Sequence, residues 1–267
     1  MNRTRRTVAD LRALKGVRQL SMVYVENTDE AAACAEAGID VLSIERHLWD
    51  PTMREAAGDC FVQVGLPYGV LATTDDYLRA GHDAVRLGAD ACYCAASIEV
   101  ISRLAAEGIP VVGHVGLIPS RRTWTGGFRA VGKTLDSALE VWRGVRALEE
   151  AGAFAAEIEV VPPEIATEIS KRTSLVMFSM GAGAGCDAQY LFSCDLLGYT
   201  RGHLPRHAKV YRDFAAEFAR LQDERIAAFT EFNADVASGA YPEEQHLVPA
   251  DPAVVEAFLD ALGPEEA

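Results

Sequence analysis

The stretch ACYCAASIEVISRLAAEGIPVVG, residues 91–113, predicts one strand–helix–strand unit. Two short apolar runs, Ala91–Cys94 and Ile109–Gly113, flank an amphipathic stretch at Ile98–Glu107. Gly108 directly follows the helical pattern, where glycine commonly ends a helix in a left-handed conformation. Short uninterrupted strands joined by helices are typical of parallel βα units with both faces of the sheet covered.

The same alternation runs nearly from end to end of the chain. Candidate strands are Gln19–Tyr24, Val41–Ile44, Phe61–Val64, Ala91–Cys94, Ile109–Gly113, Ala155–Glu159, Leu175–Ser179 and Gln189–Phe192. Candidate helices between them are Asp29–Ala37, Asp75–Leu87, Ile98–Glu107, Ser137–Ala151 and Pro163–Arg172. Eight parallel strands with helical connections predict a closed (β/α)₈ TIM-type barrel.

The chain of 267 residues has the usual length of a single α/β barrel. It has no internal repeat and no linker rich in Gly, Ser or Pro. We therefore predict one domain over residues 1–267, with a helical lead-in over 1–18. Apolar residues at helical spacing predict a long C-terminal helix over Val210–Ala237, within a helix-and-tail segment at 210–267.

Composition limits the partners and the compartment. A formal charge of −14 argues against nucleic acid and anionic membrane surfaces, which both need a basic footprint. The apolar runs are too short for a membrane span, and the Arg-containing N-terminus is not followed by a secretory apolar region. Six cysteines without such a segment predict reduced thiols in a cytoplasmic protein. Cys92 and Cys94 could resemble a metal pair, but buried structural cysteines are the favoured interpretation.

Polar side chains gather at the predicted C-terminal strand ends, which meet at one mouth of a barrel and carry its chemistry. These positions are Glu26, Asn27, Glu45, Arg46, His47, Gly65, Tyr93, Ala95, His114, Glu159 and Ser179 to Gly183. These positions include three acids, two histidines and an arginine. That is more charged and titratable residues than strand ends with a purely structural role need, although polar residues are common in loops anyway.

Glu159 is the leading candidate for a general base. It follows an apolar strand and precedes Val160-Val161-Pro162, and apolar surroundings raise the pKa of a carboxyl. Such a carboxyl suits proton abstraction near neutral pH. The alternative is a paired or partly solvated structural carboxylate. Glu157 should share the face of Glu159 one layer deeper, unless a bulge turns it outward.

Two glycine-containing segments supply further candidates. His114 ends its predicted strand within Gly-His-Val-Gly, and it is either an active-site residue or a core histidine that holds a loop. The loop Gly181–Gly185 offers backbone N–H groups and room for a ligand. It does not match a dinucleotide fingerprint, because Cys186 stands where the last glycine would be.

Three stretches together resemble the ketopantoate hydroxymethyltransferase family, barrel enzymes of the phosphoenolpyruvate/pyruvate-domain group. They are Gly113–Pro119, Ala151–Pro162 and Met180–Gln189, and the similarity is clear from Gly108 to about Tyr241. The resemblance implies a divergent member of an enzyme family in pantothenate biosynthesis. That family transfers a hydroxymethyl group from methylenetetrahydrofolate to 3-methyl-2-oxobutanoate. It also implies that Glu159 is the base and that His114 lies beside the keto acid.

In this family Mg²⁺ holds the keto acid and stabilises its enolate through three carboxylates after strands two, three and four. The resemblance aligns these positions with Arg46 (or, one residue earlier, Glu45), Gly65 and Ala95, and the family's substrate-binding lysine with Tyr93. Mg²⁺ requires oxygen ligands, so we expect the family's metal site to be absent. Arg46 could instead bind a carboxylate or enolate bidentately, with His47 or His114 beside it. Altered metal ligation through Glu26, Glu45 and His47 is the alternative.

The favoured hypothesis is an enzyme that forms or breaks a C–C bond next to the carbonyl of a small 2-oxo acid through an enolate. Its predicted catalytic residues are Glu159 and His114. Its predicted substrate-binding residues are Arg46, His47, Glu45, Tyr93, Ser179, Gly181 and Gly183. The alternative is a non-catalytic or substrate-switched paralogue that has lost the metal site. The predicted partner is a small-molecule carboxylate, and the resemblance implies a homo-oligomer.

Overall fold

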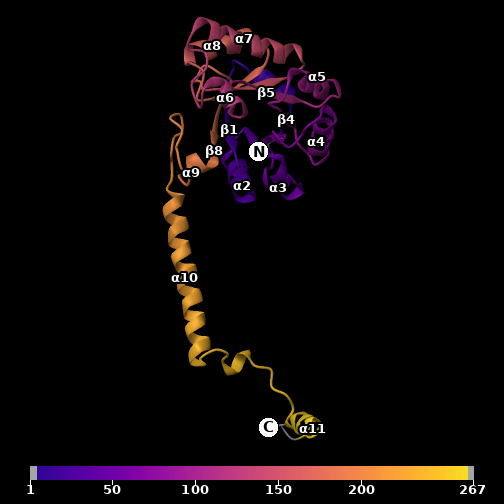
Figure 1. Cartoon of the computed structure of the whole chain (residues 1–267), viewed down its shortest axis with the longest axis vertical. Coiled ribbons are helices and arrows are strands. Elements are labelled where there is room, and N and C mark those ends of the chain that lie inside the picture. The colour runs from indigo at the N-terminus through magenta and orange to yellow at the C-terminus, as the bar shows by residue number, and fades with distance from the viewer. Residues whose placement is uncertain (1–4, 264–267) are drawn as a thin grey trace. The chain divides into compact units, whose positions relative to one another are not determined.

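Eight parallel strands close a barrel in chain order in the computed structural model, which describes residues 5–263 (Figure 1). The strands are β1 Leu20–Tyr24, β2 Val41–Glu45, β3 Phe61–Gly65, β4 Ala91–Tyr93, β5 Val111–Gly116, β6 Ala155–Glu159, β7 Val176–Met180 and β8 Ala188–Phe192. Pairing of β1 with β8 from Leu20↔Ala188 to Tyr24↔Phe192 completes the ring. The predicted (β/α)₈ barrel is confirmed.

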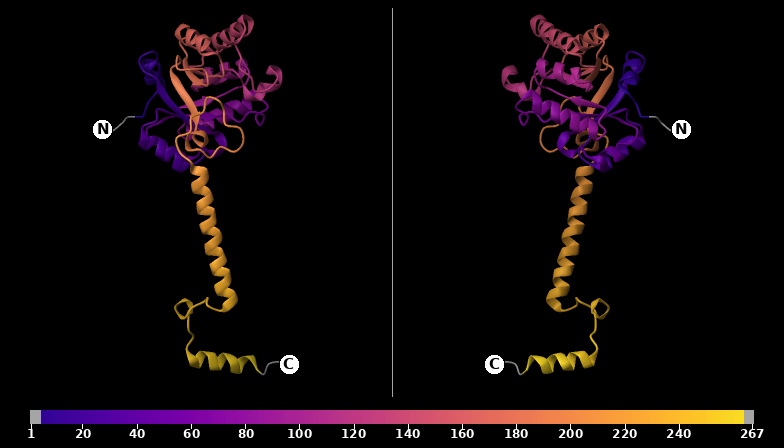
Figure 2. Two further views of the ribbon diagram at one scale, coloured as in Figure 1. Left: turned by 90° about the vertical axis from the view of Figure 1, so that its left-hand side faces the viewer. Right: turned by 90° about the vertical axis from the view of Figure 1, so that its right-hand side faces the viewer.

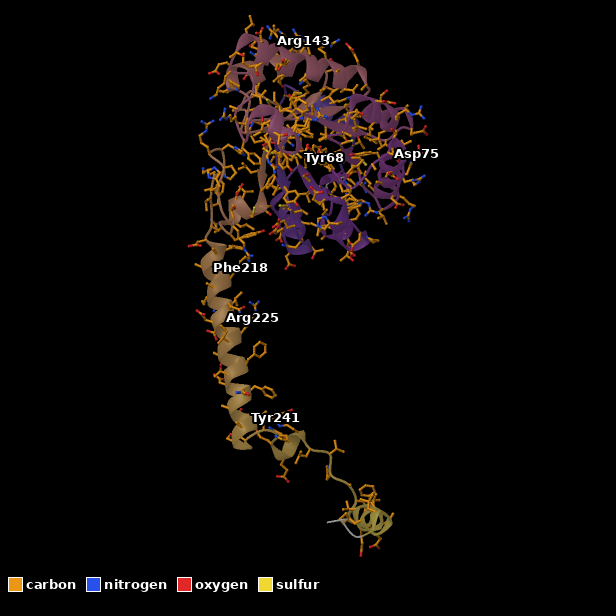
Figure 3. The ribbon with its side chains drawn as sticks, in the orientation of Figure 1. Tyr68, Asp75, Arg143, Phe218, Arg225 and Tyr241 are labelled. Atoms are coloured by element: carbon orange, nitrogen blue, oxygen red, sulfur yellow. The ribbon has the colours of Figure 1, made fainter. Side chains whose placement is uncertain are left out.

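Helices cover the outside of the barrel, and side-chain caps begin most of them. They are α2 Thr28–Ala37, α3 Pro51–Ala56, α4 Thr74–Arg86, α5 Ile98–Ala106, α7 Leu135–Glu150 and α8 Pro163–Arg172. The caps Asn27, Thr73, Ser97 and Thr134 each accept a hydrogen bond from a backbone N–H in the first turn. Asp75 on α4 and Arg143 on α7 are exposed on this helical layer (Figure 3). Between β7 and β8 the chain runs through the loop 181–187 without a helix.

Alternate residues of each strand point into the barrel, as the pleat requires. At the amino end of the strands, α1 (Val8–Leu14) closes the barrel, and its fully buried Leu11 belongs to the interior cluster with Phe61 and Phe154. The outward-facing residues pack beneath the helices. Cys92 and Cys94 are both fully buried in that outer apolar layer, which confirms the structural interpretation.

The chain forms two compact units, one up to Asp213 and one from Phe214 onward. The second unit contains α10 (Phe214–Ser238), the short turn Glu244–His246 and α11 (Pro252–Leu262). Figure 2 shows α10 as one unbroken helix, which confirms the predicted C-terminal helix. A single domain over 1–267 stays a prediction. No helix among the described residues is long and apolar enough to cross a membrane.

The helix α10 begins four residues later than the pattern predicted. The N–H of Tyr211 donates to the carbonyl of Leu196 at the end of α9 (Ser193–Leu197). A Cβ on Gly198 would lie only 2.1 Å from the carbonyl oxygen of Arg212. These contacts hold residues 210–213 in a non-helical conformation beside α9, so the helix starts only at Phe214.

Candidate active site

A cavity of about 1010 Å³ opens at the carboxyl ends of the strands, where barrel chemistry is expected. Strand residues on its wall are Tyr24, Ser43, Glu45, Gly65, Tyr93, His114, Glu157, Glu159, Met180, Tyr190 and Phe192. Loop residues on its wall include Glu26, Leu117, Pro119, Phe128, Lys133, Val160, Gly181, Asp195, His203, Arg206 and His207. Of the predicted site residues, Glu45, Tyr93, His114, Glu159 and Gly181 are therefore brought together.

Glu159 is the last residue of β6, and its side chain lies on the cavity wall with its Oε2 atom 3.3 Å from His114 Nε2. The next residue, Val160, has a φ of 49°. Positive φ is strained for a β-branched residue, at a cost of about 1–3 kcal/mol. The strained conformation is held because Val160 N–H donates to the Met180 carbonyl and Val131 N–H donates to the Val160 carbonyl.

Gly116, the last residue of β5, permits this arrangement on the neighbouring strand. Its φ is 86°, and a Cβ there would lie 2.3 Å from the carbonyl oxygen of Glu159. That distance excludes any larger residue. Two neighbouring strand ends therefore approach one another closely at the candidate base.

His114 is almost fully buried, although its ring reaches the cavity wall. Its Nε2 atom lies 3.0 Å from the carbonyl oxygen of Leu117, so Nε2 must carry a proton and donate it. Its Nδ1 atom lies 2.6 Å from the Tyr93 hydroxyl. The histidine is thus fixed in its orientation and at the same time forms part of the cavity.

Glu157 lies one layer below Glu159 inside the barrel, as predicted. Gln63 Nε2 donates to its Oε1 atom at 2.6 Å and contacts Ser43 Oγ at 3.0 Å. Burial raises the pKa of Glu157 to about 7 and is opposed by His114 and Gln63, whereas Glu159 and Glu45 raise it further. A carboxyl that can hold a proton near neutral pH therefore lies directly beneath the candidate base.

The positions that the resemblance aligns with the family's metal ligands, Glu45 or Arg46, Gly65 and Ala95, supply at most one carboxylate. Glu45 ends β2 on the cavity wall, and burial raises its pKa, with the charge of His47 opposing. A Cβ on Gly65 would lie 3.3 Å from Glu45 Oε2, so the Glu45 carboxylate occupies the space beside the glycine. Ala95 has no ligand atom in its side chain. Across residues 5–263, no group of three or more His, Cys, Asp and Glu side chains is arranged to hold a metal ion.

Arg46 and His47 are not on the cavity wall. Both belong to the 3-10 turn Arg46–Leu48 that follows β2. Because the strand has ended, their side chains no longer alternate between the inside and the outside of the barrel. The Arg46 guanidinium lies 3.6 Å from Asp83 of α4 and donates to the carbonyl of Trp49. The structure therefore does not bring Arg46 to a bound carboxylate or enolate.

Ser179 and Gly183 support the β7–β8 loop and do not line the cavity. The Ser179 hydroxyl donates to the Gly183 carbonyl at 2.9 Å and accepts from the N–H of Ala182. Gly181 does reach the wall, and its φ is 69°. A Cβ on Gly181 would lie 2.6 Å from His207 Nδ1, so only glycine leaves room for this imidazole.

Four basic side chains on the wall were not among the predicted site residues. They are Lys133 after the glycine loop 126–127, and His203, Arg206 and His207 in the loop that follows α9. Burial lowers the pKa of His207, whereas Glu159 and Asp195 oppose this effect. The segment Gly202–Pro205 contributed to the family resemblance, but no periodicity indicates which way an irregular loop directs its side chains.

Comparison with known proteins gives the same family as the sequence motifs. The model of the family "Ketopantoate hydroxymethyltransferase" matches residues 48–244. The 3-methyl-2-oxobutanoate hydroxymethyltransferase of Cenarchaeum symbiosum is 33% identical over 255 residues, covering 87% of this chain and 95% of that protein.

Two solved structures share the fold at low identity. A phosphoenolpyruvate phosphomutase from Streptomyces platensis subsp. rosaceus has a TM-score of 0.51 at 14% identity, covering 97% of this chain and 96% of that one. A phosphonopyruvate hydrolase in complex with oxalate and Mg²⁺ has a TM-score of 0.51 at 14% identity, covering 96% of both chains. At this identity the likeness concerns the barrel alone.

Proposed function

The chain belongs to the ketopantoate hydroxymethyltransferase family, and from this premise we propose that Glu159 is the general base of a C–C bond enzyme. Its substrate is a small 2-oxo acid, and its reaction passes through an enolate. The observation that carries the proposal is the Glu159 carboxyl on the cavity wall, next to a buried imidazole and a strained residue. Strain of this kind is concentrated at functional sites.

The chemistry requires one proton transfer and a place for negative charge. Glu159 takes the proton from the carbon next to the carbonyl, and the C–H electron pair forms the C=C bond of the enolate. The carbonyl π electrons move to oxygen, which becomes anionic. The substrate carboxylate binds the basic side of the cavity, where Lys133 and Arg206 reach the wall. The enolate carbon then attacks the one-carbon electrophile, or the reverse sequence cleaves the bond.

The family implies Mg²⁺, and the phosphonopyruvate hydrolase neighbour was crystallised with it. The residues of this chain do not fit that ion, because Gly65 and Ala95 supply no oxygen ligand and Glu45 alone remains. We therefore propose enolate formation without the family's metal. Because Arg46 pairs with Asp83 outside the cavity, groups on the cavity wall must balance the charge.

The second candidate function is a non-catalytic or substrate-switched barrel. The same two positions, Gly65 and Ala95, favour it, since losing metal ligands commonly accompanies loss of the original reaction. Two observations oppose this second candidate. The pKa of Glu157, beneath the proposed base, is about 7, and Val160 has a strained backbone. A barrel that only binds a ligand requires neither feature.

The one-carbon donor, the oligomeric state and the cellular location rest on the family resemblance. A volume of about 1010 Å³ leaves room for a second reactant beside a small keto acid, which agrees with methylenetetrahydrofolate as one-carbon donor. The folate, a homo-oligomeric assembly and a cytoplasmic location stay predictions.

Deuterium exchange tests the proposal directly. The protein is incubated in D₂O with 3-methyl-2-oxobutanoate, and loss of the C3 proton is followed by NMR. Parallel samples contain EDTA, added Mg²⁺ or the Glu159→Gln variant. We expect exchange that survives EDTA and disappears in the variant. Exchange that requires Mg²⁺ would contradict the metal-free reaction, and no exchange under any condition would favour the non-catalytic barrel or another substrate.

A further inference from the structure

The connection between β5 and α7 has a charge opposite to that of the chain as a whole. Residues 108–135 contain four lysine and arginine side chains and no aspartate or glutamate, although the formal charge of the chain is −14. The four are Arg121, Arg122, Arg129 and Lys133. We call residues 119–133, which carry all four, the basic segment. Part of this segment lines the cavity, so its charge lies at the carboxyl end of the barrel.

The four basic side chains form no ion pair with an acid in the described part of the chain. On α8, by contrast, the exposed Arg172 pairs with Glu168. Arg121 donates to the backbone carbonyls of Ala95 and Ala96, each at 3.3 Å. Carbonyls orient a guanidinium without neutralising it, so the charge of the basic segment is available to an anion from outside the chain.

Two exposed aromatic rings accompany these charges. Trp124 is 89% exposed and Phe128 is 68% exposed, and Phe128 also lies on the cavity wall. The Cζ atom of Arg122 lies 5.5 Å from the centroid of the Phe128 ring, as in a cation–π contact. Exposed tryptophan next to arginine is typical of binding surfaces, where these residue types contribute most of the binding energy.

Local hydrogen bonds hold these side chains in a defined arrangement. The short helix α6 (Arg122–Thr125) ends at Gly126, which has a φ of 74°. The Thr125 hydroxyl lies 3.0 Å from the Arg122 carbonyl oxygen and 2.8 Å from that of Gly127. The turn brings Arg122 onto Phe128 and leaves the Trp124 ring in solvent.

We propose that the basic segment binds a second reactant, an aromatic molecule that carries two or more anionic groups. Its ring packs against Trp124 and Phe128, and its anionic groups pair with Arg122 and Arg129. This assignment rests on the proposed function, because the enolate formed at Glu159 needs a second molecule that supplies the electrophile. Phe128 joins the basic segment to the cavity in which that enolate forms. The segment binds this molecule and takes no part in bond making.

The side chains of the basic segment select this class of ligand. An uncharged aromatic molecule would leave the arginine charges without partners, and a simple anion would leave the indole of Trp124 in water. A nucleic acid or an anionic membrane would be repelled by the charge of −14 on the whole chain. A small aromatic anion satisfies both the rings and the guanidinium groups, since arginine binds carboxylate and phosphate alike.

Isothermal titration calorimetry on the full chain tests the ligand class. The probes are 5-formyltetrahydrofolate, whose rings carry two carboxylates, and ATP, whose ring system carries phosphates. Glutarate and tripolyphosphate are the matched anions without a ring. We expect one probe to bind at least about tenfold more tightly than its ring-free control, the usual effect of stacking one ring. The probe that does so identifies the anionic group, and the proposal is overturned if neither does.

Variants of exposed residues locate the site. Trp124→Ala should weaken binding of that probe about tenfold, whereas Trp124→Phe should restore most of the affinity. Arg122→Gln and Arg129→Gln should each weaken it about threefold to fivefold, as expected for exposed charge pairs. Arg143→Gln is the control, since Arg143 is exposed on α7 and has no ion pair in the described residues (Figure 3). Variants of the basic segment that bind as Arg143→Gln does would refute the assignment.

Tryptophan fluorescence gives a readout that does not depend on turnover. Of the three tryptophans, Trp49 is buried and Trp142 is half-buried, whereas Trp124 is exposed. Binding of the probe should quench the wild-type emission, and Trp124→Phe should lose this change while calorimetry still shows binding. Quenching that persists in Trp124→Phe would place the aromatic ring elsewhere and would contradict the proposed site.

The two proposals fail in different ways. Wild-type protein that exchanges the C3 proton but binds neither probe better than its ring-free control leaves Glu159 as base and refutes only the role of the basic segment. Wild-type protein that binds a probe through Trp124 but exchanges no proton refutes the proposed function. The binding site then remains, but it is not the site of a second reactant.

Discussion

The two ends of the barrel use acidic side chains in opposite ways. At the amino end, three aspartates precede strands and each is paired with basic side chains. The pairs are Asp40 with Arg6 and Arg18, Asp90 with Arg5 and Arg54, and Asp187 with Lys15. Each aspartate also accepts a backbone N–H from a neighbouring strand, at Ser21, Val62 and Met177 respectively. These contacts tie α1 and the strand starts together.

At the carboxyl end, Glu45, Glu157 and Glu159 have no ion pair with a lysine or arginine among the described residues. Their neighbours are an imidazole, an amide and one another. Basic partners therefore stabilise the carboxylates at the amino end, whereas burial raises the pKa of Glu45 and Glu157 at the carboxyl end. The barrel thus has paired acids at the amino end of its strands, which we call the floor, and acids without a lysine or arginine partner in residues 5–263 at the carboxyl end, which we call the mouth.

The largest expected effect is on chemistry at the mouth. Glu159→Gln removes the base and should lower the rate of C3 proton exchange by about 10²–10⁴-fold, the usual contribution of a general base. The free energy of unfolding should change little, because the amide keeps the size of the carboxyl. NMR exchange and urea denaturation on the same sample measure the two quantities. A large loss of stability without loss of exchange would place Glu159 with the structural acids of the floor.

The next effect concerns stability at the floor. Burial opposes ionisation of Asp40, but hydrogen bonds from Arg18 and Ser21 and the charges of Arg18 and Arg6 outweigh it and lower the pKa. Asp40→Asn should lower the free energy of unfolding by about 2–3 kcal/mol at pH 7. The stabilisation is complete above the ordinary pKa of 3.8 and is lost as the pH falls through the lower folded value, so wild type and variant should converge in acid.

Urea denaturation at pH 7 and at pH 3 checks this prediction. Glu168→Gln is the control, because the ion pairs of Glu168 with Lys171 and Arg172 are exposed and should contribute little to the free energy of unfolding. Proton exchange per folded Asp40→Asn molecule should match the wild type. A fall in exchange would mean that floor and mouth are coupled.

Glu157→Gln should change stability in the opposite direction. Since burial raises the folded pKa of Glu157 to about 7, its ionised form costs stability as the pH rises from the ordinary value of 4.5. The variant should gain about 3 kcal/mol over the wild type between pH 4.5 and pH 8, and nothing at pH 4. Thermal unfolding across this range measures the gain. Glu150→Gln, an exposed site, should show no such trend, and a pH-independent difference at Glu157 would contradict a raised pKa.

The smallest effect tests strain beside the base. Val160→Asn places a residue that tolerates positive φ where a β-branched side chain stands, and should raise the free energy of unfolding by about 1 kcal/mol. Val17→Asn is the control at an exposed position. An unchanged or lower stability in Val160→Asn would mean that the mouth stores no strain at this residue.

Strand positions were predictable because buried strands need continuous apolar runs. β6 was predicted at its observed bounds, whereas β5 begins two residues later and ends three residues later than expected. Pro110 has no N–H to contribute to a ladder, and pairing of His114↔Glu157 and Gly116↔Glu159 extends the strand at its other end. His114 is therefore inside the sheet, where its ring faces the barrel.

The misplacement of Arg46 and the omission of the basic wall residues have one cause. Arg46 was expected at the mouth because it follows a strand, but a helical turn begins there and carries its side chain to Asp83. Lys133, Arg206 and His207 were not predicted because they lie in irregular loops. Strand periodicity predicts which way a side chain points only while the strand continues.

The sequence alone determined the order of strands and helices and the closed barrel, because apolar periodicity encodes them, and the family resemblance selected Glu159 as the candidate base. The sequence also determined that Gly65 and Ala95 cannot act as metal ligands through their side chains. Only the tertiary structure decided that Tyr93 and Glu157 both lie next to Nδ1 of His114, although the three residues come from three different strands. Contacts between strands depend on register and barrel closure, which involve residues distant in the chain, and no local pattern records them.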